Sequence, residues 1–226
     1  MSMRSPTRVV VAVGHALLAE SIELALRAAG HVARHVVLSA TAGTLARVIA
    51  DITDDPPDIA LVDIDPGSFE GIRLVAPLSR NQIEVVALTT SPVGARWGEA
   101  VRYGASAVLS RSRPLSDILG TVDRLAAGLP VMSREQLDRL VDEWQRGQAE
   151  RRAVLARLDS LTAREAEVLG QLLAGHQVRR IAADSGVSES TVRTQVKAIL
   201  TKLGVTTQIG AVGRANQVGW RPPTAP

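Results

Sequence analysis

A group of hydroxyl and cationic side chains between residues 188 and 197 has the chemistry to bind nucleic acid. Arg193 and Lys197 can donate hydrogen bonds to guanine O6 and N7, and Thr194 offers a hydroxyl and a methyl group. On a helix these three lie within little more than one turn, although such residues also suit a solvated helix face. The hydroxyls at the start of that helix are suited to phosphate contacts: Ser188, Ser190 and Thr191.

Helix start and stop signals predict how these side chains are positioned. Thr162 and Glu165 form a capping box that begins a first helix, and Gly175 ends it. A second helix over residues 178–184 and a third over 189–203 are joined by a tight turn. This is the helix-turn-helix arrangement, whose second helix enters a major groove. The neighbouring cations that we expect to bind phosphates are Arg179, Arg180 and Lys202.

The order and spacing of residues 161–215 resemble a known DNA-binding domain. The segment contains LTAREAEVL, then IA, VSESTVR and KLGV, and resembles the LuxR-type helix-turn-helix of the NarL family of bacterial response regulators. The resemblance implies an all-α domain of four helices, in which helix 189–203 reads DNA and a helix at about 208–217 pairs two copies. Gln195 stands where the family usually has His, and Gln208 stands where it often has Arg. These differences concern the DNA sequence that is read and the contacts to the DNA backbone, rather than DNA binding as such.

Upstream, β-branched apolar runs alternate with helical patterns. Five βα units in about 120 residues predict an α/β fold, a five-stranded doubly wound parallel sheet of the flavodoxin-like kind. The strands are expected at 8–13, 31–38, 58–62, 83–88 and 105–109, and the helices at 16–29, 41–51, 69–78, 93–103 and 114–127. The carboxyl edge of such a sheet usually holds the site, and here it carries Val13, Gly14, Asp63, Thr89 and Arg111.

This pattern is similar to the receiver domain of response regulators. The resemblance implies that Asp63 is equivalent to the phosphate-accepting aspartate and that Thr89 is equivalent to the hydroxyl residue that senses the phosphoryl group. Typical receivers hold Mg²⁺ with two acidic residues where this chain has Val13 and Gly14, and have a lysine where this chain has Arg111.

These departures predict an atypical receiver. Phosphoryl transfer to a carboxylate needs a cation, and Mg²⁺ prefers several oxygen ligands in octahedral geometry. Asp63 and Asp65 alone would be a poor site, so we predict no switching by conventional Mg²⁺-dependent phosphorylation. Asp63 is instead expected to pair with Arg111. For Thr89, an ordinary strand-end residue is an equal alternative.

The chain is expected to contain a receiver at 1–128, a helical connector at 129–159, a DNA-binding domain at 160–219 and a disordered tail at 220–226. The connector is rich in helix formers, and a heptad pattern from Leu137 is apolar at most positions. Packing against a second copy and packing within the chain are both consistent with this pattern.

Composition limits the classes of function. Lys and Arg number 26 and Asp and Glu 23, a net charge of +3. Residues 151–226 hold 11 basic and 5 acidic residues (+6), leaving 15 and 18 (−3) before them, which indicates a nucleic-acid partner for the C-terminal part. There is no cysteine, no apolar run of membrane-spanning length and no signal-peptide pattern, so a cytoplasmic location without membrane contact is expected.

No catalytic constellation or cofactor motif is recognisable, and His31 and His35 lack a third metal ligand. The first hypothesis is therefore a non-enzymatic, sequence-specific regulator that binds double-stranded promoter DNA as a dimer. Its receiver would answer to a small-molecule ligand, a protein partner or concentration. In a second hypothesis, the protein is a conventional two-component response regulator that is phosphorylated at Asp63. A third makes the chain an interaction module that forms heterodimers with a related regulator.

Overall fold

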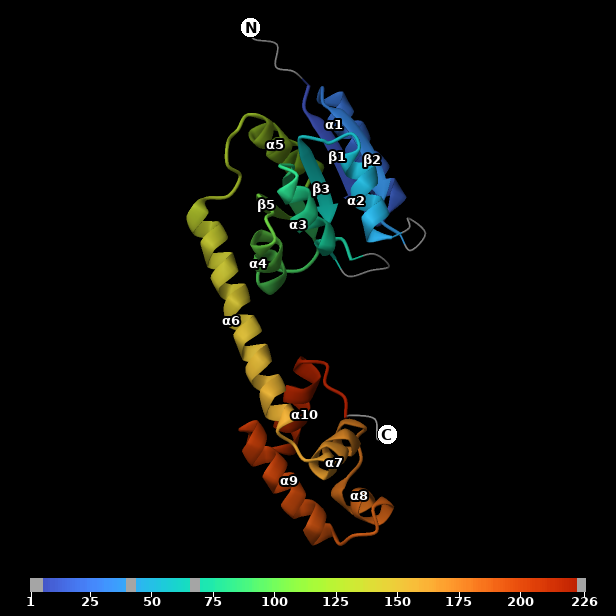
Figure 1. Cartoon of the computed structure of the whole chain (residues 1–226), viewed down its shortest axis with the longest axis vertical. Helices are drawn as coiled ribbons and strands as arrows, with labels where there is room; N and C mark the ends of the chain where they lie inside the picture. The colour runs from blue at the N-terminus through green and yellow to red at the C-terminus, as the bar shows by residue number, and fades with distance from the viewer. Residues whose placement is uncertain (1–5, 40–43, 66–69, 223–226) are drawn as a thin grey trace. The chain divides into compact units, whose positions relative to one another are not determined.

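The computed structural model describes residues 6–39, 44–65 and 70–222, and contacts within the chain divide it into two compact units. One unit comprises Met1–Gln145 and the other Arg146–Pro226. Figure 1 shows the sheet and its helices in the first unit and the helices of the second. Each unit has a hydrophobic core of its own.

The N-terminal unit is built on a five-stranded parallel sheet with the order β2-β1-β3-β4-β5 (Figure 1), which confirms the predicted fold class. Its central strands are buried on both faces, which explains why they read as continuous apolar runs rather than as alternating patterns. The strands are β1 (Arg8–Val13), β2 (Val32–Val37), β3 (Ile59–Asp63), β4 (Glu84–Thr89) and β5 (Ala107–Ser110).

Helices cover both faces of this sheet. Apolar residues of α1 and α5 pack on one face, and those of α2, α3 and α4 pack on the other. The helix starts predicted at Thr41 and Phe69 lie outside the described residues. The helices are α1 (Ala16–Ala28), α2 (Leu45–Thr53), α3 (Ile72–Arg80), α4 (Ala95–Arg102) and α5 (Leu115–Ala126).

The long helix α6 (Arg134–Asp159) occupies most of the predicted connector. In the N-terminal unit, Leu140 of α6 is buried against α4 at Gly98, where an added Cβ would lie 2.0 Å from the Leu140 carbonyl oxygen. In the C-terminal unit, Val154 and Leu158 belong to the core. Apolar positions of the heptad pattern therefore pack within the chain at both ends of α6.

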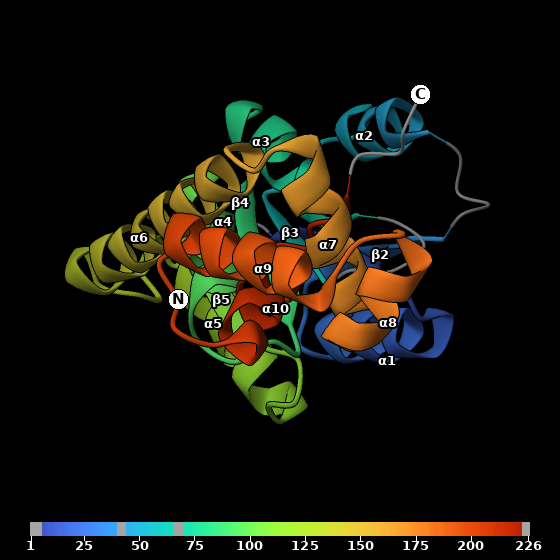
Figure 2. The same ribbon diagram turned by 90° about the horizontal axis from the view of Figure 1, so that it is seen from below.

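The C-terminal unit consists of the end of α6 and four further helices. The predicted capping box of Thr162 and Glu165 is confirmed at the start of α7, and Gly204, in the left-handed conformation at φ 65°, ends α9. Helix α9 contacts α7, α8 and α10, as Figure 2 also shows. These helices are α7 (Ala163–Leu173), α8 (Val178–Asp184), α9 (Glu189–Leu203) and α10 (Gln208–Gln217).

The tail prediction is wrong for its first residues. Trp220 packs against the C-terminal core, and its backbone N–H donates to the carbonyl of Ala215 at 2.9 Å. An indole has enough apolar area to order the chain that carries it. Residues 223–226 of the predicted tail lie outside the described residues. Over the described ranges, no helix is long and apolar enough to cross a membrane.

Candidate nucleic-acid interface and sheet-edge site

The start of α9 is fixed by hydroxyl groups. The backbone N–H of Thr191 donates to Oγ of Ser188 at 3.2 Å, so Ser188 caps the helix. The Oγ atoms of Ser188 and Ser190 are 2.7 Å apart, and Oγ of Ser188 lies 2.9 Å from Oγ1 of Thr191. The three predicted phosphate-binding hydroxyls therefore form one exposed cluster at the first turn.

The buried stripe of α9 determines which side chains are presented outward. Val192, Val196, Ile199 and Leu203 enter the core, and the opposite face exposes Arg193, Thr194 and Lys197. Arg193 is 69% exposed, and its ion pair with Glu189 at 3.3 Å lies at the surface, where it is readily exchanged for another anion. Lys197 makes no ion pair with any residue in the described ranges.

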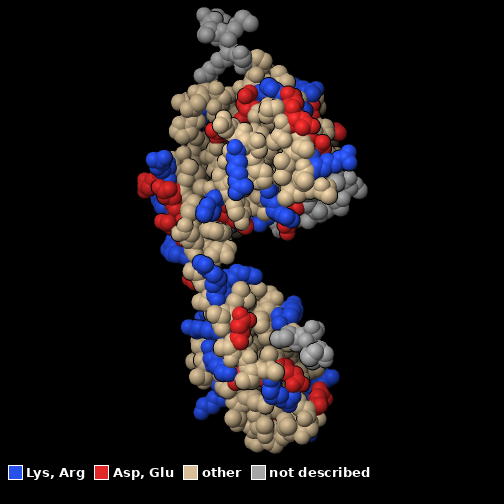
Figure 3. Space-filling view, viewed as in Figure 1, with Lys and Arg blue, Asp and Glu red and all other residues tan. Residues whose placement is uncertain are grey.

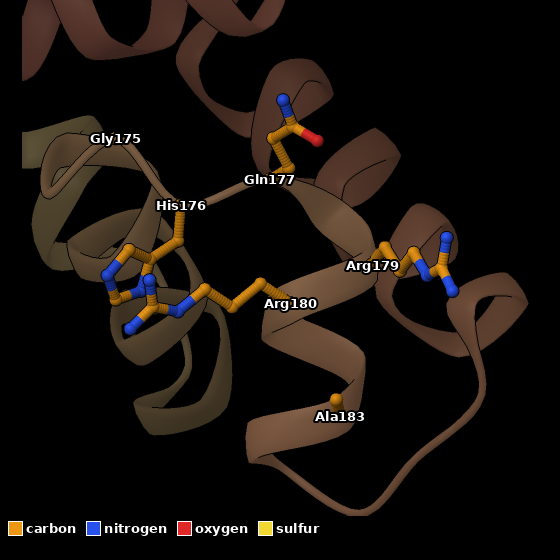
Figure 4. A pocket seen from close by; sticks show the side chains of 6 residues that line it. All are labelled: Gly175, His176, Gln177, Arg179, Arg180 and Ala183. Atoms are coloured by element: carbon orange, nitrogen blue, oxygen red, sulfur yellow. The ribbon is translucent and has the colours of Figure 1, made fainter.

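Basic side chains outnumber acidic ones on the face of the C-terminal unit seen in Figure 3, in keeping with the charge of this segment. On α8, Arg179 and Arg180 are both exposed, and Nε of Arg180 lies 3.5 Å from Oδ2 of Asp184. They border a cavity of about 460 Å³ beside the loop before α8. In Figure 4 the Arg180 side chain extends toward the ring of His176, whereas Arg179 extends away from it.

Lys202 differs from the other predicted DNA contacts. Its Nζ donates to Oε2 of Glu165 at 2.6 Å and to the carbonyl of Ser160 at 3.1 Å. Burial opposes ionisation of Glu165, but the hydrogen bonds from Lys202 and Thr162 outweigh it and lower the pKa of that carboxyl. Lys202 thus serves the internal structure of the domain, because its ammonium already compensates a buried carboxylate.

At the sheet edge, Arg111 and Asp63 form the ion pair that the sequence predicted. The backbone N–H of Arg111 donates to the carbonyl of Thr89 at 2.8 Å, which holds the arginine beside the end of β4. Its guanidinium donates to Oδ2 of Asp63, and its Nη2 lies 3.8 Å from Oδ2 of Asp65. The Asp63 side chain is only 8% exposed, so this cation compensates a largely desolvated carboxylate.

Asp65 is the centre of a hydrogen-bond network that sequence reasoning missed. Thr89 is fully buried and its hydroxyl donates to Oδ1 of Asp65, so it is more than an ordinary strand-end residue. The N–H and hydroxyl of Thr90 both donate to Oδ2 of Asp65 at 2.7 Å. Burial opposes ionisation of Asp65, but these hydrogen bonds and Arg111 lower its pKa. The available signal was the Asp-x-Asp spacing at 63 and 65.

The residues at this edge do not fit a Mg²⁺ site. Val13 is fully buried and apolar, and Gly14 has no side chain. The carboxylates of Asp63 and Asp65 already accept hydrogen bonds from Arg111, Thr89 and Thr90. Among the described residues, no group of three His, Cys, Asp or Glu side chains is placed to hold a metal ion. Mg²⁺ binding would require replacing these bonds without gaining further anionic ligands.

Comparison with known proteins agrees with this architecture. Residues 159–215 match the family described as bacterial regulatory proteins, luxR family. The probable transcriptional regulatory protein NarL of Mycobacterium tuberculosis is 31% identical over 219 residues, covering 95% of this chain and 97% of that protein. The transcriptional regulatory protein MctR of Rhizobium johnstonii is 26% identical over 215 residues, covering 94% of each.

Among solved structures, a complex of the two-component response regulator RcsB with DNA is 20% identical, covering 95% of this chain and all of that one, with a TM-score of 0.47. The near-complete coverage by the 31% identical relative decides the classification. The chain belongs to the NarL/LuxR family of transcriptional response regulators.

Proposed function

We propose that this protein is a sequence-specific DNA-binding transcriptional regulator that inserts α9 into the major groove of promoter DNA. The single observation that carries the proposal is the outward face of α9, where Arg193, Thr194 and Lys197 are exposed together. Two cations and a hydroxyl on one helix face can contact base edges, while the hydroxyls at its first turn reach the phosphate backbone.

The proposed complex is a homodimer on a two-fold related site. Helix-turn-helix proteins read half-sites one helical turn apart, so each copy contributes one reading helix. In the C-terminal unit, Ile209 on α10 is 86% exposed. An isoleucine this exposed is a suitable contact for the same helix of a second copy, because pairing would remove its apolar surface from water. In this proposal, residues 160–219 form the DNA-binding domain and 1–128 the receiver.

The test begins by selecting a preferred duplex from a random library with the full-length protein. Fluorescence anisotropy then compares wild type with Arg193→Ala/Lys197→Ala on the selected duplex and on a scrambled one. We expect the double variant to lose the preference for the selected duplex, at about 1–3 kcal/mol per lost base contact. Far-ultraviolet circular dichroism and the melting temperature should be unchanged, because both side chains are exposed.

A variant of equal charge separates specific from general effects. Arg152→Ala/Arg221→Ala also removes two exposed cations from the C-terminal unit, but neither residue lies on α9. It should retain the preference for the selected duplex and lose affinity only through the salt-dependent term. Equal specific affinity of the α9 variant and wild type would show that another surface reads the DNA.

We also propose that the receiver does not use Mg²⁺-dependent phosphorylation. The support is the paired state of Asp63 with Arg111, together with Val13 and Gly14 in place of acidic ligands. The wild type and Asp63→Asn are incubated with acetyl phosphate and Mg²⁺ beside a conventional receiver, with intact mass and light scattering as readouts. We expect no added phosphate and no change in oligomeric state. Phosphate on the wild type but not on Asp63→Asn would restore the conventional mechanism.

A further inference from the structure

A cavity of about 430 Å³ opens in the N-terminal unit between α3, α4 and the first half of α6. This volume is within the range of small-molecule sites. None of the described residues that line it belongs to the hydrogen-bond network at the sheet edge. Its lining residues are Ala76, Ser79, Arg80, Arg102, Tyr103 and Trp144.

The cavity is cationic. Arg80 and Arg102 are exposed, and neither side chain forms a hydrogen bond or ion pair with another residue of the described ranges. None of the described residues that line the cavity is acidic. A neighbouring cavity shares Ala76 and Tyr103 with this one. Its arginines, by contrast, have acidic neighbours, since Nη1 of Arg96 lies 3.1 Å from Oε2 of Glu99. Two uncompensated guanidinium groups at one cavity are suited to a phosphate or carboxylate.

The cavity also has aromatic walls with hydrogen-bond donors. Tyr103 is 41% exposed, and Trp144 is partly buried. The indole Nε1 of Trp144 is buried and has no hydrogen-bond partner in the part of the chain that the structure describes. Buried donors are usually paired, so this N–H is a group that a ligand would satisfy. The hydroxyl of Ser79 adds a further donor or acceptor.

We propose that this cavity binds a small organic anion that carries a planar ring. Arg80 and Arg102 bind its phosphate or carboxylate, and Tyr103 and Trp144 contact the ring. Trp144 belongs to α6, and the other lining residues belong to α3 and to the end of α4. The ligand therefore contacts three helices of the N-terminal unit. This site goes beyond the proposed DNA binding, and its failure would leave that proposal untouched.

The experiment uses the full chain and two probes that share this chemistry, adenosine monophosphate and benzoate. Binding is followed by calorimetry and by tryptophan fluorescence, with inorganic phosphate and adenosine as probes that carry only half of the recognised features. We expect saturable binding of at least one ring-bearing anion, about tenfold or more tighter than either half-probe. Which of the two binds distinguishes a phosphate ligand from a carboxylate ligand.

Variants locate the binding. Arg80→Ala/Arg102→Ala should weaken binding about tenfold or more, whereas the equal-charge control Arg47→Ala/Arg113→Ala should not. Trp144→Phe should remove the fluorescence response that belongs to this indole, while calorimetry still reports affinity. The proposal would be overturned if neither ring-bearing probe showed saturable binding, or if the two double variants lost affinity equally. It would also be overturned if inorganic phosphate bound as tightly as the ring-bearing anions.

Discussion

Arg111 donates a hydrogen bond to Oδ2 of Asp63 across the carboxyl edge of the sheet. The same guanidinium lies 3.8 Å from Asp65, whose carboxylate holds the buried hydroxyl of Thr89. The positive charge of one arginine therefore offsets the negative charges of two adjacent carboxylates, as a bound metal ion could. Arg111 directly follows β5, and its backbone N–H donates to the carbonyl of Thr89 at the end of β4, so this network links neighbouring strands of the sheet.

Arg111→Ala should destabilise the N-terminal unit. It would leave the largely buried carboxylate of Asp63 beside Asp65 without a cation, and losing one partner of such a pair costs about 1–3 kcal/mol when solvent reaches part of the site. Urea denaturation followed by circular dichroism measures the change. Arg113→Ala, which breaks a pair 3.3 Å long between well-exposed groups, should change the free energy of unfolding by less than about 0.5 kcal/mol. Similar losses of unfolding free energy in both variants would show that the Arg111–Asp63 ion pair is no more stabilising than an exposed one.

Asp65→Asn should change how stability depends on pH. Because the folded-state pKa of Asp65 is lowered below its ordinary value of 3.8, its charge stabilises the fold above that pH. This contribution is lost as pH falls through the folded-state pKa. The difference in unfolding free energy between wild type and Asp65→Asn should therefore be largest near neutral pH and shrink below about pH 4. A difference that stays constant from neutral to acidic pH would contradict the assigned role.

Much of the fold was predictable because local signals determine it. The alternation of buried strands and helices, the capping box at Thr162 and the buried stripe of α9 all depend on residues close in sequence. The roles of Asp65 and Lys202 were harder to predict, because their hydrogen-bond partners, Thr89 and Glu165, are distant in the chain. Trp220 was misassigned because the prolines after it favour an extended chain, whereas its ring finds a packing site.

Gly98→Ala should separate α6 from α4. An added Cβ would lie 2.0 Å from the backbone oxygen of Leu140, and backbone cannot move aside as a flexible side chain can. We expect a loss of about 1–3 kcal/mol and faster hydrogen exchange in residues 134–145. Gly147→Ala is the matched control, since nothing lies within 4 Å of its added Cβ. It should instead stabilise α6 by about 0.5–1 kcal/mol, through helix propensity alone.

Lys202→Ala and Lys197→Ala should have opposite profiles, although each removes one lysine from α9. Lys202 compensates the buried Glu165, so its loss should lower the melting temperature of the C-terminal unit. Lys197 is exposed, so its loss should leave stability intact and weaken DNA binding. Scanning calorimetry and anisotropy on the same preparations separate the two effects. If Lys197→Ala melts earlier and Lys202→Ala does not, the assignment of the two lysines is reversed.

Ile209→Glu should weaken pairing on DNA without unfolding the protein. Ile209 is 86% exposed and contributes little to the core, so the melting temperature should stay within a few degrees of wild type, consistent with a change of about 0.5 kcal/mol or less. In a dimer about α10, two glutamates would face each other across the pairing surface. Titration of a two-half-site duplex should then lose its cooperativity, while affinity for a single half-site is retained. Gln217→Glu, at the exposed end of α10, adds the same charge and should preserve cooperativity. Undiminished cooperativity of Ile209→Glu would place the pairing surface elsewhere on the chain.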